Sequence, residues 1–167
     1  LAKICEPRTL STKVRQTLIA IAGEPNRYVR EAALKHLKKS KLAEDEVQTL
    51  EGYLTRKTAD FRRSIFELLL NRADKLAVGT IDRLLSAGDA NQRAAGIELA
   101  RRMVDDERMA EPIRERLRDY REAKGKRLAS AEAEAIEIVL NPASRPPTLE
   151  DGLGLFDPAD RTPTVAP

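Results

Sequence analysis

Tryptophan is missing from this chain of 167 residues, and cysteine and histidine occur once each, as Cys5 and His36. A single cysteine excludes an internal disulfide and fits a reducing compartment. One cysteine and one histidine are too few for a structural zinc site of the Cys/His type. The sequence also lacks the spacing of a calcium-binding loop. We therefore predict a cytoplasmic protein without a metal site.

Residue patterns typical of catalysis are missing as well. His36 is expected on a polar helix flank, with no serine, cysteine or aspartate arranged around it for nucleophilic chemistry. Cys5 has no neighbouring group that would lower its pKa. The segment DGLGLFD, residues 151–157, has two glycines but lacks the Lys-Ser/Thr pair of a phosphate loop. We predict no catalytic residue, no cofactor and no enzymatic activity; an enzyme with its active groups outside this stretch remains an alternative.

Long apolar runs are also absent, since no stretch approaches the roughly 18 residues needed to cross a bilayer. We therefore expect no membrane partner. The first ten residues, LAKICEPRTL, contain neither an initiator methionine nor the apolar core of a signal peptide. From this we expect the chain to be an excerpt of a longer protein.

Alanine and leucine supply most of the 41% hydrophobic residues, whereas aromatic residues make up 4%. This bias favours helix over sheet. Apolar periodicity then predicts eight helices in four pairs with short connections. Their approximate ranges are 11–22, 26–39, 43–56, 60–71, 74–87, 90–104, 108–123 and 130–140. Val14 is expected on the inward face of the first helix, and Val29 on that of the second. The predicted fold is all-α, with a helical domain over residues 1–140 and a Pro-rich extended tail or linker over residues 141–167.

One motif recurs along the helices. Arg30, Arg62 and Arg93 are 32 and 31 residues apart, each followed by a small residue two positions later and a large apolar residue four positions later. Recurrence at this interval is typical of a supersecondary unit that stacks on copies of itself. We interpret the arginines first as residues of the seams between units, paired with acidic side chains or carbonyls. Asp60 and Asp89 are candidate partners or helix caps.

This arginine frame resembles HEAT-like repeats of the armadillo/HEAT superfamily over about residues 11–104, and more weakly to residue 140. The resemblance implies a right-handed α-α superhelix of three to four helix pairs, with first helices on the convex side and second helices on the concave side. The usual proline of the first helix is absent, so armadillo and other helical-pair repeats stay open. The tail segment TLEDGLGLFDPADRTP, residues 148–163, is similar to large bacterial molybdate-metabolism-regulator-like proteins, which implies a bacterial source and no mechanism.

Charge is distributed unevenly. Residues 1–41 hold 10 Lys or Arg against 3 Asp or Glu, a net charge of +7, whereas the whole chain carries +3. The outward positions of the second helices mix both signs. Glu31 alternates with Arg63, and Lys35 with Glu67, between the first two units, which predicts lateral charge pairs. This pattern favours a non-catalytic scaffold that binds a protein or another domain of the same chain. The predicted partner-binding residues are Arg27, Glu31, Lys35, Lys38, Lys39, Arg63, Glu67, Glu98, Arg101 and Arg102.

The N-terminal basic cluster supports an alternative function, nucleic-acid binding. Phosphate contacts need several cations on one surface, and Arg27, Lys35, Lys38, Lys39 and Lys41 are close in sequence. Base stacking needs aromatic side chains, however, and only one tyrosine, at position 28, is near this cluster. The tail is a separate case: its residues Leu153, Leu155 and Phe156 are predicted to dock on the last helix pair.

Overall fold

In the computed structural model, which describes residues 10–56 and 59–141, the chain is helical, with eight α-helices and two short 3-10 helices. The first four helices are α1 (Thr12–Ala22), α2 (Arg27–Leu37), α3 (Glu44–Gly52) and α4 (Ala59–Leu70). The others are α5 (Asp74–Ser86), α6 (Ala90–Asp105), α7 (Ala110–Lys124) and α8 (Ser130–Leu140). The 3-10 helices are η1 (Tyr53–Thr55) and η2 (Gly125–Arg127). The predicted all-α class is confirmed for these residues.

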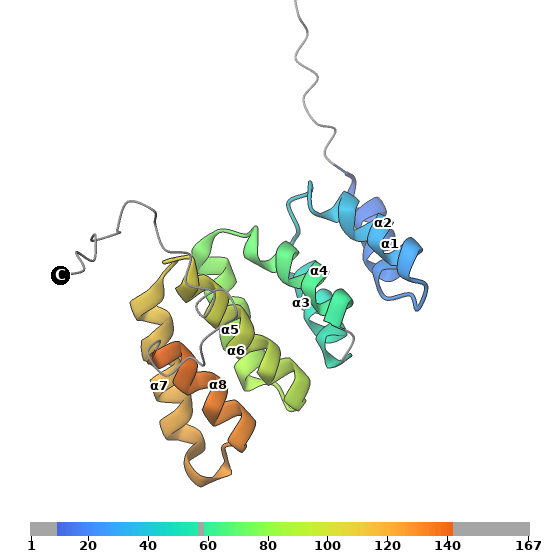
Figure 1. The fold of residues 1–167 in the computed structure, drawn as a ribbon. Helices are drawn as coiled ribbons and strands as arrows, with labels where there is room; N and C mark the ends of the chain where they lie inside the picture. The colour runs from blue at the N-terminus through green and yellow to red at the C-terminus, as the bar shows by residue number, and fades with distance from the viewer. Residues whose placement is uncertain (1–9, 57–58, 142–167) are drawn as a thin grey trace, which may run out of the picture.

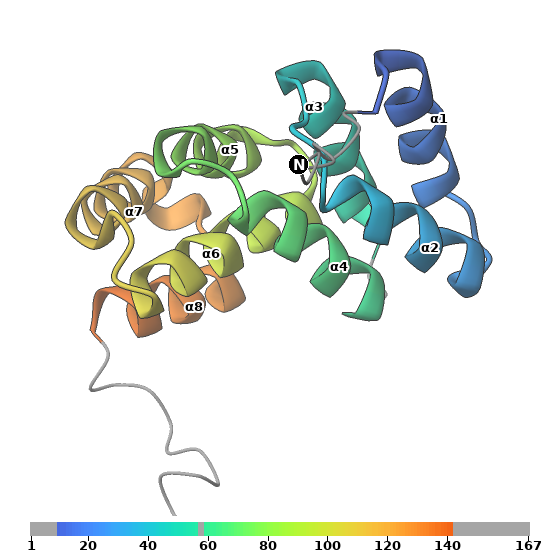
Figure 2. The same cartoon turned by 90° about the horizontal axis from the view of Figure 1, so that it is seen from above.

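The helices are arranged as four pairs that follow one another in chain order (Figure 1). Seen from above, α1, α3, α5 and α7 form one row, and α2, α4, α6 and α8 form the other (Figure 2). The core lies between the rows, where Leu50, Leu69, Ile81 and Leu99 are fully buried. We call the two sets the first-helix row and the second-helix row.

Local sequence signals set several helix ends. The Ser11 hydroxyl accepts from the amide of Val14 at the start of α1. The Asn26 side chain accepts from Tyr28 N at 3.0 Å at the start of α2. The Asp89 carboxylate accepts from two amides of the first turn of α6, at 2.9 and 3.0 Å. Each supplies an acceptor to a backbone amide that has no partner within the helix.

The start of α7 differs from the prediction. The pattern predicted a helix from Arg108, whereas α7 begins at Ala110. Glu107 and Met109 have φ values of 57° and 50°, in the left-handed region that interrupts a helix. This turn directs the Arg108 guanidinium toward the connection before α5, where it donates to Leu70 O at 2.8 Å and to the Asp74 carboxylate at 2.7 Å.

Two further expectations are wrong. Val14 and Val29 were expected to face inward, but they are 44% and 46% exposed. The buried side of α2 is formed instead by Arg30, Ala33, Leu34 and Leu37. A helix buries only the face that meets a neighbour, and within the described residues α1 and α2 are covered by another pair only on the side of α3 and α4. The prediction about the tail falls outside the described residues.

Candidate protein interface on the second-helix row

Two of the three recurring arginines, Arg30 and Arg93, close the loops inside their own helix pairs. Arg30 donates from Nη1 to the carbonyls of Glu24 and Pro25, both at 3.2 Å. Arg93 makes the equivalent bonds to Ala87 and Gly88, at 3.2 and 2.8 Å. In both cases the acceptors lie six and five positions before the arginine. The repeated frame therefore specifies how the connection between two helices is held.

A further contact of Arg30 and of Arg93 reaches the next helix pair. The Arg30 guanidinium lies 4.8 Å from the centre of the Phe61 ring. Arg93 donates from Nε to the Glu132 carboxylate of α8 at 2.9 Å, which confirms an acidic partner at the seam. The partner is not Asp89, which caps α6 instead. Arg62 instead lies 5.9 Å from the centre of the Phe66 ring of its own helix, α4. Arg30 and Arg93 are therefore seam residues.

Other ion pairs join neighbouring helices of the first-helix row. Arg15 of α1 pairs with the buried Glu46 of α3 at 3.0 Å, and the same carboxylate accepts from the amide of Ala43 at 2.8 Å. Arg83 of α5 pairs with Glu51 of α3 at 2.6 Å. Hydrogen bonding to Glu51 raises the pKa of Arg83 despite partial burial. Side chains of the first-helix row are therefore used largely to hold successive pairs together.

The predicted partner-binding residues lie on α2, α4 and α6 of the second-helix row, except for Lys38 and Lys39, which directly follow the end of α2. The structure brings Lys38 and Glu67 together as an ion pair between α2 and α4. A lateral pair was expected at this seam, but with Lys35 as the partner of Glu67. Lys38 is the C-cap of α2, three residues after Lys35, and therefore projects from about the same side of the helix. The remaining expected lateral pair, Glu31 with Arg63, is replaced by a bond from Arg27 to Glu31 within α2, at 2.7 Å.

Glu98 lies at the centre of a second group of charges, on α6. It accepts from Arg101 at 3.0 Å and from Arg102 at 2.8 Å, and Arg101 also pairs with Asp105 at 2.9 Å. Burial opposes ionisation of the Glu98 carboxyl, but the hydrogen bonds from the two arginines outweigh it and lower the pKa of Glu98. The hydrogen bond from Arg101 to Glu98 likewise raises the pKa of Arg101.

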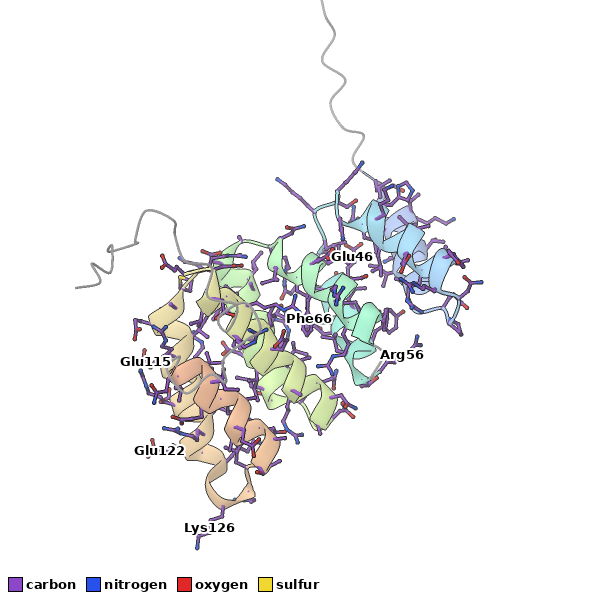
Figure 3. All side chains as sticks on the ribbon, in the orientation of Figure 1. Glu46, Arg56, Phe66, Glu115, Glu122 and Lys126 are labelled. Carbon is purple, nitrogen blue, oxygen red and sulfur yellow. The ribbon has the colours of Figure 1, made fainter. Side chains whose placement is uncertain are left out.

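Phe66 connects this charged group to α4. The Arg102 guanidinium lies 5.0 Å from the centre of the Phe66 ring, across the seam between α4 and α6. Phe66 itself is labelled in Figure 3. The ring is 3% exposed, so its cation–π contact with Arg102 is largely shielded from water. Arg102 therefore takes part both in the contact between α4 and α6 and in the group of surface charges around Glu98. Lys35, Lys39 and Arg63 remain as exposed cations of the predicted set.

Sequence reasoning missed Glu132, which is 7% exposed and joins two helix pairs. Its carboxylate accepts from Arg93 at 2.9 Å and from the Tyr120 hydroxyl at 3.2 Å. Burial, and then the Glu132 charge, raise the pKa of Tyr120. Glu132 follows Arg93 by 39 residues, outside the interval of the repeat, so spacing alone gave no signal for it.

The described residues contain no cluster of three or more His, Cys, Asp or Glu side chains that could hold a metal ion. Among the same residues, no helix is both long and apolar enough to cross a bilayer. What the structure does show at this site is a series of ion-paired side chains along α2, α4 and α6, above the packed helical core.

The fold and this surface define an all-helical protein built from successive helix pairs. The chain belongs to DUF5724, a family of unknown function whose family model matches residues 1–167. No curated protein and no solved structure matches the chain.

Proposed function

We propose that this chain is a non-catalytic scaffold module, and that its second-helix row binds a protein or another domain of the same chain. The observation that carries the proposal is the mixed charge pattern across α2, α4 and α6. Lys38–Glu67 joins two of these helices, and Arg102 over Phe66 joins the next two. Side chains fixed in this way lose less conformational entropy on binding than free ones.

We further infer that the four pairs form a right-handed superhelix of the HEAT-like type, with the second-helix row on its concave side. The chain order of the pairs and the loop-closing role of Arg30 and Arg93 support this inference. The single cysteine supports a cytoplasmic location. Concave surfaces of stacked helix pairs are the usual binding faces of such proteins.

The mixed signs favour a protein partner over a nucleic acid. Arg27 and Lys38, two of the five cations of the N-terminal basic cluster, are paired with Glu31 and Glu67. Protein interfaces commonly match charges of both signs, which fixes orientation and excludes wrong partners. Nucleic-acid binding stays as the second candidate because Tyr28 is 83% exposed beside Arg27, where a base could stack on its ring.

A photocrosslinking amino acid tests the proposal directly. It is placed at Arg63 on α4 and, as a matched control, at Glu115 on α7; both positions are exposed and helical. Expressed in its native cell, the Arg63 variant is expected to form one discrete adduct with a protein or with its own remaining chain. Equal adduct patterns at the two positions would show that the second-helix row is not a preferred interface.

Heparin chromatography separates the two candidates. The scaffold function predicts weak retention that changes little when Lys35, Lys38 and Lys39 are replaced by Glu. Nucleic-acid binding predicts strong retention that falls steeply as the salt concentration rises and that this triple variant abolishes, because cations bound to phosphates release counterions. A variant with three lysines outside the N-terminal basic cluster replaced in the same way, Lys75, Lys124 and Lys126, controls for net charge.

A further inference from the structure

A groove on the described surface lies between the α2–α3 connection and the start of α5. It has a volume of about 400 Å³, within the range of ligand-binding pockets. Its apolar lining comes from Leu37 and Leu68, which are buried, and from Leu42 and Leu76, which are accessible. Leu76 is 49% exposed, one of only four large apolar side chains in the described residues to be so open. Covering it would remove apolar surface from water.

The charges around this groove have one sign. Lys38, Lys41 and Arg72 line it, and no carboxylate does. Lys38 and Arg72 are paired with Glu67 and Glu44, which lie outside the groove. Lys41 is exposed at the α2–α3 connection. The groove therefore combines an apolar floor with a cationic rim, and it suits a segment with large apolar side chains and carboxylates.

Two other grooves on the protein have the opposite character. The groove between α6 and α8, of about 350 Å³, is lined by Glu98 and Glu132 against a single cation, Arg101. The groove between α1 and α3 is lined by Asp45 and Glu46 and by no cation. The one cation that lines either of these grooves, Arg101, is already paired with Glu98 and Asp105. Charge thus distinguishes the first groove, which we call the Leu76 groove.

The chain itself contains a segment of the matching composition. Residues 149–157, LEDGLGLFD, hold three leucines, one phenylalanine and three carboxylates, with no lysine or arginine. The seven residues between Asn141 and Leu149 can span about 25 Å when extended. From α8 to α4 there are two helix-to-helix steps, which correspond to about 20 Å at ordinary packing distances. The segment is long enough to reach the groove.

We propose that residues 149–157 bind in the Leu76 groove of the same chain, with leucine and phenylalanine side chains on the apolar floor and carboxylates toward Lys41 and its neighbours. This differs from docking on the last helix pair, where the α6–α8 groove is acidic. The segment then acts as an internal strap that covers the apolar floor. The groove shares Lys38 with the predicted scaffold surface, but Leu76 and Phe156, the two trapping positions, do not belong to that predicted set, so the disulfide readout can fail or succeed separately from the scaffold function.

Disulfide trapping in the full chain tests this docking. Cys5 is first replaced by Ser, and then Leu76→Cys is combined with Phe156→Cys. The control combines Phe156→Cys with Val14→Cys, because Val14 is similarly exposed, at 44%, but lies on α1. Under oxidised glutathione, the Leu76→Cys pair is expected to form an intramolecular disulfide at least about tenfold faster than the control pair, owing to a higher effective concentration.

The charge requirement gives the second readout. Adding Lys41→Glu to the trapping pair is expected to slow disulfide formation several-fold, and raising the salt concentration should have the same direction of effect. Melting curves of the reduced variants check that folding is retained. Equal rates for the two cysteine pairs, disulfide-linked dimers as the main product, or a rate unaffected by Lys41→Glu would each overturn the proposal.

Discussion

The first and third helix pairs carry the same arginine frame but are stabilised differently. Arg30 and Arg93 both hold the loop of their own pair through two carbonyls. Beyond the loop, Arg30 meets an aromatic ring on the next pair, whereas Arg93 meets a buried carboxylate. The shared contacts follow the repeated sequence, and the different contacts follow the neighbour. The frame thus defines a helix pair, while residues outside it define each seam.

The two pairs also differ in burial. Helix α1 buries two residues, Ile19 and Ala22, whereas α6 buries seven, including Leu99 and Met103. The third pair has neighbours on both sides, and the first pair has one within the described residues. Since apolar burial scales with the number of covered faces, the third pair should contribute more to stability than the first.

Removal of Arg93 should have the largest effect. Arg93→Ala leaves Glu132 buried with Tyr120 as its remaining side-chain donor, so we expect the free energy of unfolding to fall by about 2–4 kcal/mol. Arg30→Ala should cost about 1–2 kcal/mol, because it loses carbonyl bonds and a ring contact but strands no buried charge. Urea denaturation at pH 7 measures both.

A double variant identifies the cause of that difference. Combining Arg93→Ala with Glu132→Gln removes the unpaired charge, and part of the lost stability should return. If Arg30→Ala and Arg93→Ala cost the same, or if Glu132→Gln restores nothing, the carboxylate is not what distinguishes the two seams.

Much of the local structure was predictable because its causes are local. Ser11, Asn26 and Asp89 mark helix starts with side chains that accept from backbone amides, and each does so in the structure. Apolar periodicity placed all eight helices within a few residues. The exception is the turn around Arg108, where Glu107 and Met109 adopt left-handed backbone conformations. Neither is a glycine, so the sequence contains no signal for such a turn.

The site was less predictable because it depends on contacts between units. The sequence placed Lys35, Lys38 and Glu67 on facing helices, but the choice of Lys38 depends on the offset between α2 and α4. Periodicity likewise located the apolar stripe of α1 without showing which part a neighbour covers, and Val14 was therefore misplaced. The Glu132 seam needs knowledge of α8, whose connection to α6 departs from the interval of the repeat.

The first and third pairs can also be compared by how closely the backbones of their two helices approach each other. At Gly96 of α6, a methyl group would lie 2.9 Å from Leu84 Cβ and 3.2 Å from Leu85 N of α5. The corresponding position of the first pair, three residues after the arginine, is Ala33. It is buried, so the first pair already accommodates a methyl group there. Gly96→Ala should therefore destabilise the protein by about 1–3 kcal/mol, because helices α5 and α6 must move apart.

The matched control for this change is Gly79→Ala on α5. Its added methyl would meet only the end of the Arg83 side chain, at 3.8 Å. Alanine is the better helix former, so Gly79→Ala should stabilise by about 0.5–1 kcal/mol. Thermal melts of the two variants should move in opposite directions. A stabilising Gly96→Ala would mean that the third pair is no more closely packed than the first.

The smallest expected effect compares charges on the outward side of the same two pairs. Glu98→Gln weakens the bonds to Arg101 and Arg102 and should cost about 1 kcal/mol at pH 7. Glu31→Gln, which affects an exposed pair with Arg27, should cost less than about 0.5 kcal/mol. Because folding lowers the pKa of Glu98, its contribution is complete above the ordinary glutamate pKa. It is lost as the pH falls through the lowered value in the folded state. The difference in melting temperature between the native protein and Glu98→Gln should accordingly be constant from pH 6 to pH 8 and shrink as the pH is lowered toward about 3. A difference that persists unchanged at acid pH would show that Glu98 contributes through packing and not through its charge.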